Sequence, residues 1–315
     1  MKKFKDTVLL VATIVLVISS VVSFAESSSP KSVNQLMDIL AKDPNEHARI
    51  RAAARLGQIG NESANKTLVQ SILTDSSFKV RIASLRAKSR ILQRTTTELY
   101  REQDRGIRSA AETKAKISEL KRQHTTALKE LFKPSYKYNC DYSNEVKAVA
   151  AGSFVVSEDP EILPLVFEEL KKNCAISFAQ RMQKENPRMP YRGNALTSNL
   201  QHVISTYGKK AVPLIEKEHQ AAPKGDYKYS LLIILNKISQ KLAYSTDAAK
   251  YVPVHQFDPN LLPQCEEGLL TTESPGIRRE LVGILIAHGY VPASAEAQKI
   301  IDEVRAKKED INIKY

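Results

Sequence analysis

The sequence predicts an all-α protein, an α-solenoid of stacked antiparallel helix pairs with a long charged helical insertion. The strongest observation is an internal repeat, because an Asp is followed six residues later by an Arg at Asp43 and Arg49, and again at Asp75 and Arg81. The two arginines lie 32 residues apart, a period typical of units made from two helices. Apolar residues follow helical spacing, and strand-like alternation is weak throughout the chain. Two short helices cannot bury their apolar faces alone, so the units are expected to stack.

Residues 1–25 are expected to be an export signal that is removed. Three lysines precede an uncharged, largely apolar run at residues 8–22, and Ser23-Phe24-Ala25 places small residues at the positions that determine cleavage. The run is short for a membrane span, which needs about 20 residues. An uncleaved N-terminal membrane anchor is the alternative, and contact with a membrane is expected only in that case. A Ser-rich linker at residues 26–31 follows, and the expected location is periplasmic or extracellular.

Residues 32–92 are expected to hold an opening helix and the N-terminal repeat units. Asp43 and Asp75 suit the position before a helix, because a carboxylate accepts hydrogen bonds from the free amides of a first turn. Ala52, Leu56 and Ile59 then fall on one face of a helix.

Residues 93–133 interrupt the repeat and are expected to form one or two long charged helices, bent near Gly106. From residue 94 to residue 133 there are 10 Lys or Arg and 6 Asp or Glu, with no Pro. A solvated structural helix is one interpretation. The other is an arm that binds a partner, since insertions in repeat arrays often carry the specific function. Lys121 and Arg122 are the candidate contact residues in this segment.

Residues 134–315 are expected to contain degenerate repeats that end in a polar capping helix. The Asp-to-cation spacing returns at Asp141 and Lys147, and the pattern of Arg followed by apolar residues returns at Arg278. An irregular stretch near residue 190 is the candidate recognition loop. Its candidate binding residues are Arg188, Tyr191 and Arg192.

The two N-terminal units resemble HEAT-like repeats, including those of bilin-lyase-type proteins. The resemblance is carried by Asp43, Arg49, Ala52, the run Leu56-Gly57-Gln58-Ile59-Gly60, and Asp75 with Val80-Arg81. It implies an α-solenoid in which the turn Asp and the helix Arg of neighbouring units form a ladder. We therefore expect a structural role, not a catalytic one, for a set of seven residues. This set is Asp43, Arg49, Asp75, Arg81, Asp141, Lys147 and Arg278.

No catalytic motif is visible, and neither an enzymatic activity nor a cofactor or metal is expected. The six histidines never pair at a spacing of three or four, so the sequence contains no local metal-binding motif. Cys140 and Cys174 lie about one repeat apart, and an oxidising compartment would allow a disulfide between them. Buried free thiols are the alternative interpretation.

The formal net charge of +12 favours an anionic partner. Removal of residues 1–25 takes away three lysines and one aspartate, which leaves +10. We expect a protein partner with an acidic surface, bound by an exported scaffold or adaptor. One alternative is a small-ligand or anionic-polymer binding protein, or an enzyme, with its site on a basic concave face. A nucleic-acid-binding solenoid is a second alternative that requires the chain not to be exported, so nucleic acid is not the expected partner.

Overall fold

The computed structural model describes residues 32–138, 142–155, 159, 161–177, 180, 195–245 and 250–312, and it describes no side chains for residues 243–252 and 307–312. Several predicted features lie outside the described residues. They are the export signal, the linker, Asp141, Cys140, Arg188, Tyr191 and Arg192.

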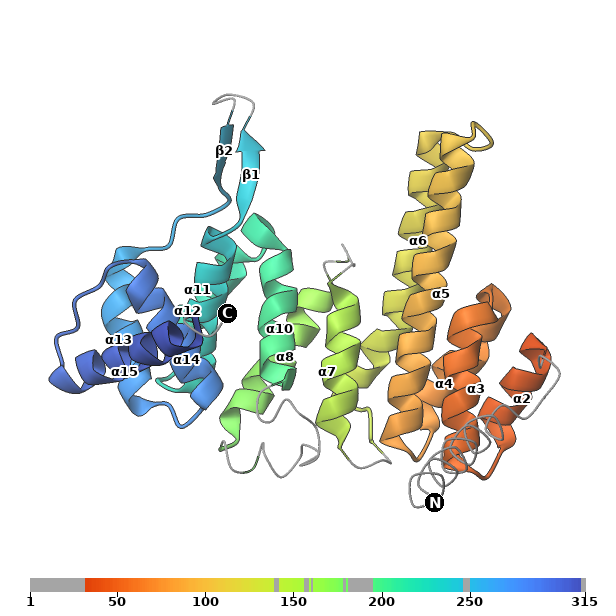
Figure 1. The fold of residues 1–315 in the computed structure, drawn as a ribbon, viewed down its shortest axis with the longest axis horizontal. Coiled ribbons are helices and arrows are strands. Elements are labelled where there is room, and N and C mark those ends of the chain that lie inside the picture. The colour runs from red at the N-terminus through yellow and green to blue at the C-terminus, as the bar shows by residue number, and fades with distance from the viewer. Residues whose placement is uncertain are drawn as a thin grey trace, which may run out of the picture.

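The predicted α-solenoid is confirmed, and its helices form two layers along one long axis (Figure 1). In one layer each helix packs against the next in the order α3 (Glu46–Ile59), α5 (Phe78–Asp104), α7 (Ser143–Phe154), α10 (Ala195–Thr206), α12 (Asp226–Ser239) and α14 (Pro275–Ala287). The helices that pack against this row are α2 (Val33–Lys42), α4 (Asn65–Thr74), α6 (Ala110–Lys129), α8 (Ile162–Ala175), α11 (Val212–Ala221), α13 (Leu262–Thr271) and α15 (Ala295–Asn312). Short 3-10 turns connect some of them, namely η1 (Glu62–Ala64), η2 (Glu130–Phe132), η3 (Gly208–Lys210) and η4 (Pro259–Leu261).

A small β-hairpin is an addition to the expected all-helical fold. Strand β1 (Leu242–Ser245) pairs antiparallel with β2 (Lys250–Pro253), with Leu242 opposite Pro253. Each strand has four residues, which is too short for a period-two pattern to stand out in the sequence. The hairpin projects from the same side of the helix row as α5 and α6 (Figure 1).

The predicted insertion is continuous with the second repeat unit. Helix α5 runs for 27 residues through residue 93 without a break, so it is about 40 Å long, whereas α3 has 14 residues and is about 21 Å long. The amides of Gly106 and Ile107 bond back to the carbonyls of Gln103 and Glu102, at 2.9 Å each, and end α5. Gly106 has φ +71°, which reverses the chain into α6. We call residues 93–133 the arm, whose outer part projects beyond the stack (Figure 1).

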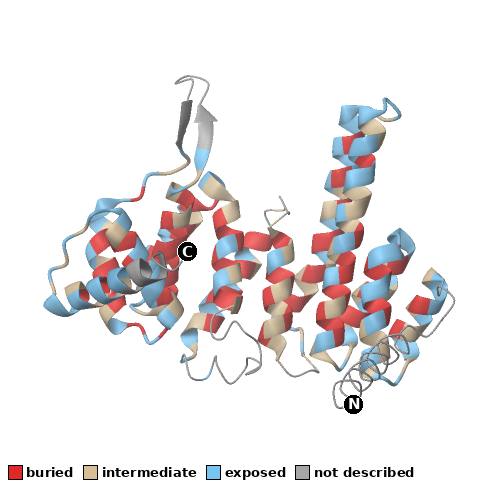
Figure 2. Cartoon of the chain, in the orientation of Figure 1, coloured by how far each residue is buried: buried red, intermediate tan, exposed pale blue. Residues whose placement is uncertain are grey.

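The base of the arm is part of the main hydrophobic core. Leu128, Leu131 and Phe132 are buried with residues of α7, α8 and α10. The outer part of the arm has a small core of its own, formed by Leu99, Ile117 and Leu120. Burial therefore decreases from base to tip (Figure 2).

The first half of helix α5 contributes to two separate cores from two faces. Val80, Ala87 and Ile91 pack with α2, α3 and α4 in an N-terminal core, while Ile82 and Leu85 join the main core. Arg94 of α5 also donates to the carbonyls of Gly57, Gln58 and Gly60, which satisfies acceptors at the end of α3. These contacts connect the first helices to the rest of the stack.

Helices α3 and α5 meet closely at Gly57. A Cβ added there would lie 2.9 Å from the Cα of Ala87, a backbone atom that moves only with its helix. We expect Gly57→Ala to lower the free energy of unfolding by about 1–3 kcal/mol, because α3 and α5 must separate to admit the methyl group.

Chemical denaturation of both variants measures this effect against a matched glycine in α7. A Cβ at Gly152 meets open space, so Gly152→Ala should gain up to about 1 kcal/mol from helix propensity. A stabilising Gly57→Ala would show that the close helix contact does not exist.

Candidate functional site

Three units of the stack share one turn geometry. The turn lies at the start of a helix in the row that runs from α3 to α14. The side chain of the turn residue accepts a hydrogen bond from the amide two residues later. Asp43 Oδ1 accepts from Asn45 at 2.8 Å, and Asp75 Oδ1 accepts from Ser77 at 2.8 Å. Thr272 Oγ1 accepts in the same way from Ser274 at 3.1 Å. Asn45, Ser77 and Ser274 then cap α3, α5 and α14 respectively.

An arginine six residues after each turn residue donates back to that residue's carbonyl. Arg49 Nη1 lies 2.9 Å from the carbonyl oxygen of Asp43, and Arg81 Nε lies 2.5 Å from that of Asp75. Arg278 Nη2 lies 2.7 Å from the carbonyl oxygen of Thr272. The same contact therefore closes the turn in all three units.

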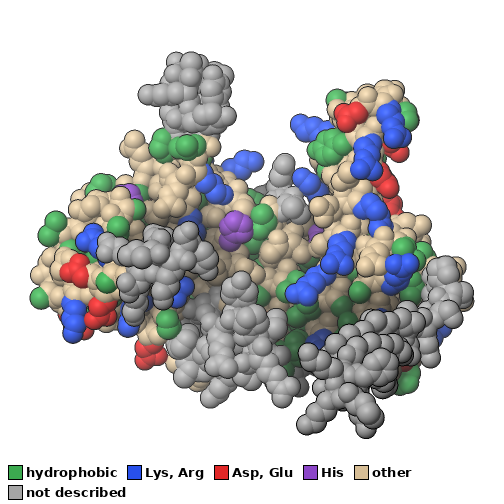
Figure 3. Space-filling model, viewed as in Figure 1, with side chains coloured by type: hydrophobic (Ala, Val, Ile, Leu, Met, Phe, Trp, Pro, Cys, Tyr) green, Lys and Arg blue, Asp and Glu red, His purple; other side chains and the backbone are tan. Residues whose placement is uncertain are grey.

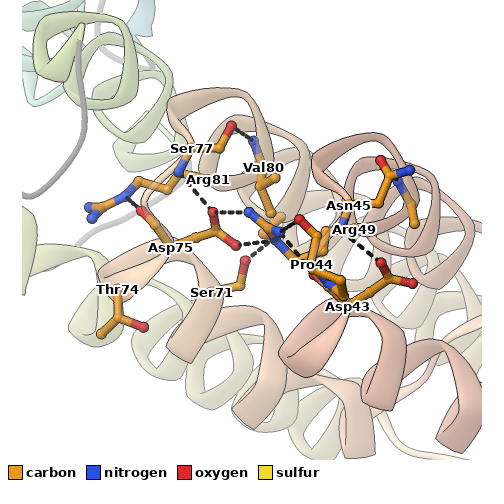
Figure 4. Close-up of polar contacts among 12 residues, drawn as sticks. Asp43, Pro44, Asn45, Arg49, Ser71, Thr74, Asp75, Ser77, Val80 and Arg81 are labelled. Atoms are coloured by element: carbon orange, nitrogen blue, oxygen red, sulfur yellow. Dashed lines mark hydrogen bonds and ion pairs between the residues drawn. The ribbon is translucent and has the colours of Figure 1, made fainter.

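Arg49 also joins the first unit to the second (Figure 4). Its Nε and Nη2 donate to the two carboxylate oxygens of Asp75, at 2.9 and 3.0 Å. The two side chains are 13% and 8% exposed. The hydrogen bond to Asp75 is the largest cause that raises the pKa of Arg49 above its ordinary value, against the opposing effect of burial. A bidentate pair of this kind fixes both distance and orientation between neighbouring units.

The next junction uses tyrosines and a glutamate that sequence reasoning missed. Arg81 is fully buried, and its Nη1 donates to the hydroxyl of Tyr136 at 2.7 Å. That hydroxyl donates in turn to the carbonyl of Leu73. Lys147 of α7 pairs with Glu169 of α8 at 2.5 Å. The sequence gives no sign of these contacts, because Tyr136 and Glu169 do not fall at the repeat spacing of the Asp and Arg residues.

The ring of Tyr138 lies beside both cations of this junction. The guanidinium of Arg81 is 5.7 Å from the ring centroid, and the Lys147 ammonium is 5.4 Å from it. Both distances allow a cation–π attraction. Arg81 and Lys147, which the sequence placed in one ladder, are thus neighbours around one aromatic ring.

The outer arm carries exposed apolar side chains among basic ones. Tyr100 is 52% exposed and Ile107 is 69% exposed, and neither was singled out from the sequence. Lys and Arg side chains follow the arm in the space-filling view (Figure 3). Of the predicted contact residues, Lys121 is half-buried, whereas Arg122 forms an exposed bidentate pair with Glu119 at 2.8 Å.

Two cysteines lie within the described residues. Cys174 Sγ is 3.8 Å from the hydroxyl oxygen of Ser230. Burial raises the pKa of the Cys265 thiol to about 12, so this thiol stays protonated at neutral pH. Since Cys140 is not described, a disulfide between Cys140 and Cys174 stays a prediction.

The described ranges contain neither a metal-binding cluster nor a membrane-spanning helix. No group of three or more His, Cys, Asp or Glu is placed to hold a metal ion there. None of the helices in these ranges combines the length and the apolar character that a membrane crossing requires.

We expect Arg49→Met to lower the free energy of unfolding by about 2–4 kcal/mol, because it leaves the mostly buried Asp75 carboxylate without its partner. Urea denaturation measures this loss, and Arg55→Met is the control, since Arg55 is an exposed arginine on the same helix. The control should change stability by no more than about 0.5 kcal/mol. Equal losses in the two variants would contradict a junction role for Arg49.

The comparison with known families is consistent with this geometry. A family model described as HEAT repeats matches residues 18–89 and 33–113, the region that contains the Asp43–Arg49 and Asp75–Arg81 turns. A search of curated proteins finds no match. The finer resemblance to bilin-lyase-type repeats stays a prediction. With its repeated turns and stacked helix pairs, the chain is a HEAT-like repeat protein.

Proposed function

We propose that this protein is an exported scaffold or adaptor that binds an acidic protein in the periplasm or cell envelope. HEAT repeats commonly mediate protein–protein interaction, which supports a protein partner in general. A stacked array suits this role, because it presents a long continuous surface that does not depend on a single pocket.

The observation that carries the proposal is the composition of the outer arm. Tyr100 and Ile107 are large, exposed and close to the turn between α5 and α6. Exposed basic side chains accompany them at Arg101 and Arg105. Aromatic and arginine side chains are enriched at the centres of protein interfaces, where they supply most of the binding energy. The exposed carboxylate of Asp104 lies there too, so the tip is mixed in charge, and its two arginines favour acidic residues beside an apolar patch on the partner.

The structure also indicates how to alter the arm without damaging the fold. Deletion of residues 93–133 would remove Leu128, Leu131 and Phe132 from the main core. Substitutions at the exposed tip avoid that loss, because Tyr100 and Ile107 are not part of the described hydrophobic cores.

We expect the double variant Tyr100→Ser and Ile107→Ser to capture its envelope partner at least about tenfold less than the unaltered protein, since interface anchors each contribute more than about 1 kcal/mol. Cross-linking in intact cells, purification of the tagged protein and mass spectrometry measure the capture.

The matched control is the double variant Ile59→Ser and Val291→Ser. It removes two exposed apolar side chains elsewhere, at 39% and 81% exposure. The control should retain the partner. Equal capture by both double variants would show that the arm is not part of the binding surface. The absence of any enriched protein would contradict the proposal that the protein is a scaffold.

Export makes a separate prediction about the N-terminus. The protein recovered from cells is expected to begin at Glu26, because Ser23-Phe24-Ala25 has the small residues that direct cleavage. Intact mass and N-terminal sequencing of the fractionated cells measure this. Retention of Met1 in a soluble cytosolic fraction would contradict export and favour the nucleic-acid alternative.

A further inference from the structure

A small pocket with a mixed polar and apolar lining lies at the base of the arm, where η1, α4, α5 and α6 meet. Its volume is about 20 Å³, a little more than a single water molecule needs. The polar side chains that line it are Glu62, Asn65, Lys88, Thr95, Gln123 and His124. None of these residues has a part in the turns and junctions described above.

Lys88 brings a buried cation to this pocket. The residue is 5% exposed, and among the described residues no carboxylate lies within 4.0 Å of its ammonium and no group accepts a hydrogen bond from it. Burial lowers the pKa of Lys88 to about 8, so the ammonium is still mostly charged at neutral pH. A buried charge without a partner is costly, so the site favours an anion.

His124 brings a second polar group. It is 2% exposed, and its Nδ1 has no hydrogen-bond partner among the described residues. Burial, and after it the charge of Lys88, lower the pKa of His124 to about 3, so the ring is neutral. A neutral imidazole carries one N–H donor and one acceptor nitrogen, so the ring can present a donor. Asn65 and Thr95, which line the same pocket, carry a further amide and a hydroxyl.

We propose that this pocket binds one monovalent anion of halide size, held by Lys88 and His124 at the joint between the arm and the stack. The Lys88 ammonium matches the charge of such an ion, and the small volume of about 20 Å³ favours a halide over larger anions. Glu62 is the competing group, because its exposed carboxylate lines the pocket and can turn toward Lys88. The bound ion would connect α5 and α6 with η1 and α4, and thereby fix the direction of the arm.

The charged and titratable groups that line the pocket are Lys88 from α5, His124 from α6 and Glu62 from η1. Anion binding needs the Lys88 ammonium, so affinity should fall as the pH rises beyond about 8. Without the anion, the unfolded chain holds a proton on Lys88 up to its ordinary pKa of 10.5, whereas the folded chain loses it near 8. The unfolded state therefore binds more protons between these values, and the contribution of Lys88 to stability rises with pH across this window.

The test compares sodium bromide with sodium isethionate at equal ionic strength, using the purified protein at neutral pH. Bromide should raise the thermal unfolding midpoint by a few degrees more than the larger isethionate ion does, and the protein should broaden the chloride NMR line until bromide displaces chloride. Lys88→Met should abolish both effects. Lys114→Met, which removes an exposed charge from the same arm, should keep them.

Two further outcomes decide between the anion and Glu62. Glu62→Gln should strengthen bromide binding if the carboxylate competes with the ion. If Glu62→Gln and Lys88→Met instead alter the unfolding midpoint in the same direction with no bromide dependence, Glu62 is the partner of Lys88 and the proposal is wrong. Equal responses to bromide and isethionate, or equal loss of the response in Lys88→Met and Lys114→Met, would also overturn it. The NMR measurement on the unaltered protein needs no variant to fold.

Discussion

The stack depends on one contact, the arginine that donates back to the carbonyl six residues earlier. In the first unit Arg49 makes this contact to Asp43 and, with its remaining nitrogens, clamps the carboxylate of Asp75 in the next unit. One guanidinium therefore closes its own turn and sets the position of the following one. This is possible because a guanidinium offers five donors in a fixed plane, which an ammonium does not. Lys147, at the corresponding position of α7, forms an ion pair with Glu169.

The parts of the fold that were visible in the sequence are those with a regular period. The spacing of Asp43, Arg49, Asp75 and Arg81 predicted both the stack and the turns that the structure contains. In the turn before α14 only the arginine could be recognised in the sequence. The side chain that accepts the amide hydrogen bond there belongs to Thr272, whereas an aspartate accepts it in the first two units. A hydroxyl and a carboxylate can both accept from an amide, but a pattern search for Asp does not find Thr.

Other features could not be predicted because they depend on contacts between distant segments. Tyr136 lies 55 residues from Arg81 along the chain, and no local pattern connects them. The pocket at Lys88 and His124 is likewise formed by helices on opposite sides of a long hairpin, and each residue alone looks like an ordinary member of a charged helix. The interruption of the period at residue 93 was visible, yet the continuity of α5 through it was not. A helix that leaves the core keeps its backbone hydrogen bonds, so its sequence does not mark the point of departure.

The two faces of α5 have a mechanical consequence. Roughly half of its length of about 40 Å lies beyond the 21 Å that α3 covers, and the buried half separates the N-terminal core from the main core. The helix is thus a lever that pivots near Lys88, with about 15 Å of its length on the buried side and about 24 Å toward the tip. A sideways force on the tip would compress one core and stretch the other. Tension applied by a bound partner would therefore strain the packing first at the boundary between the two cores.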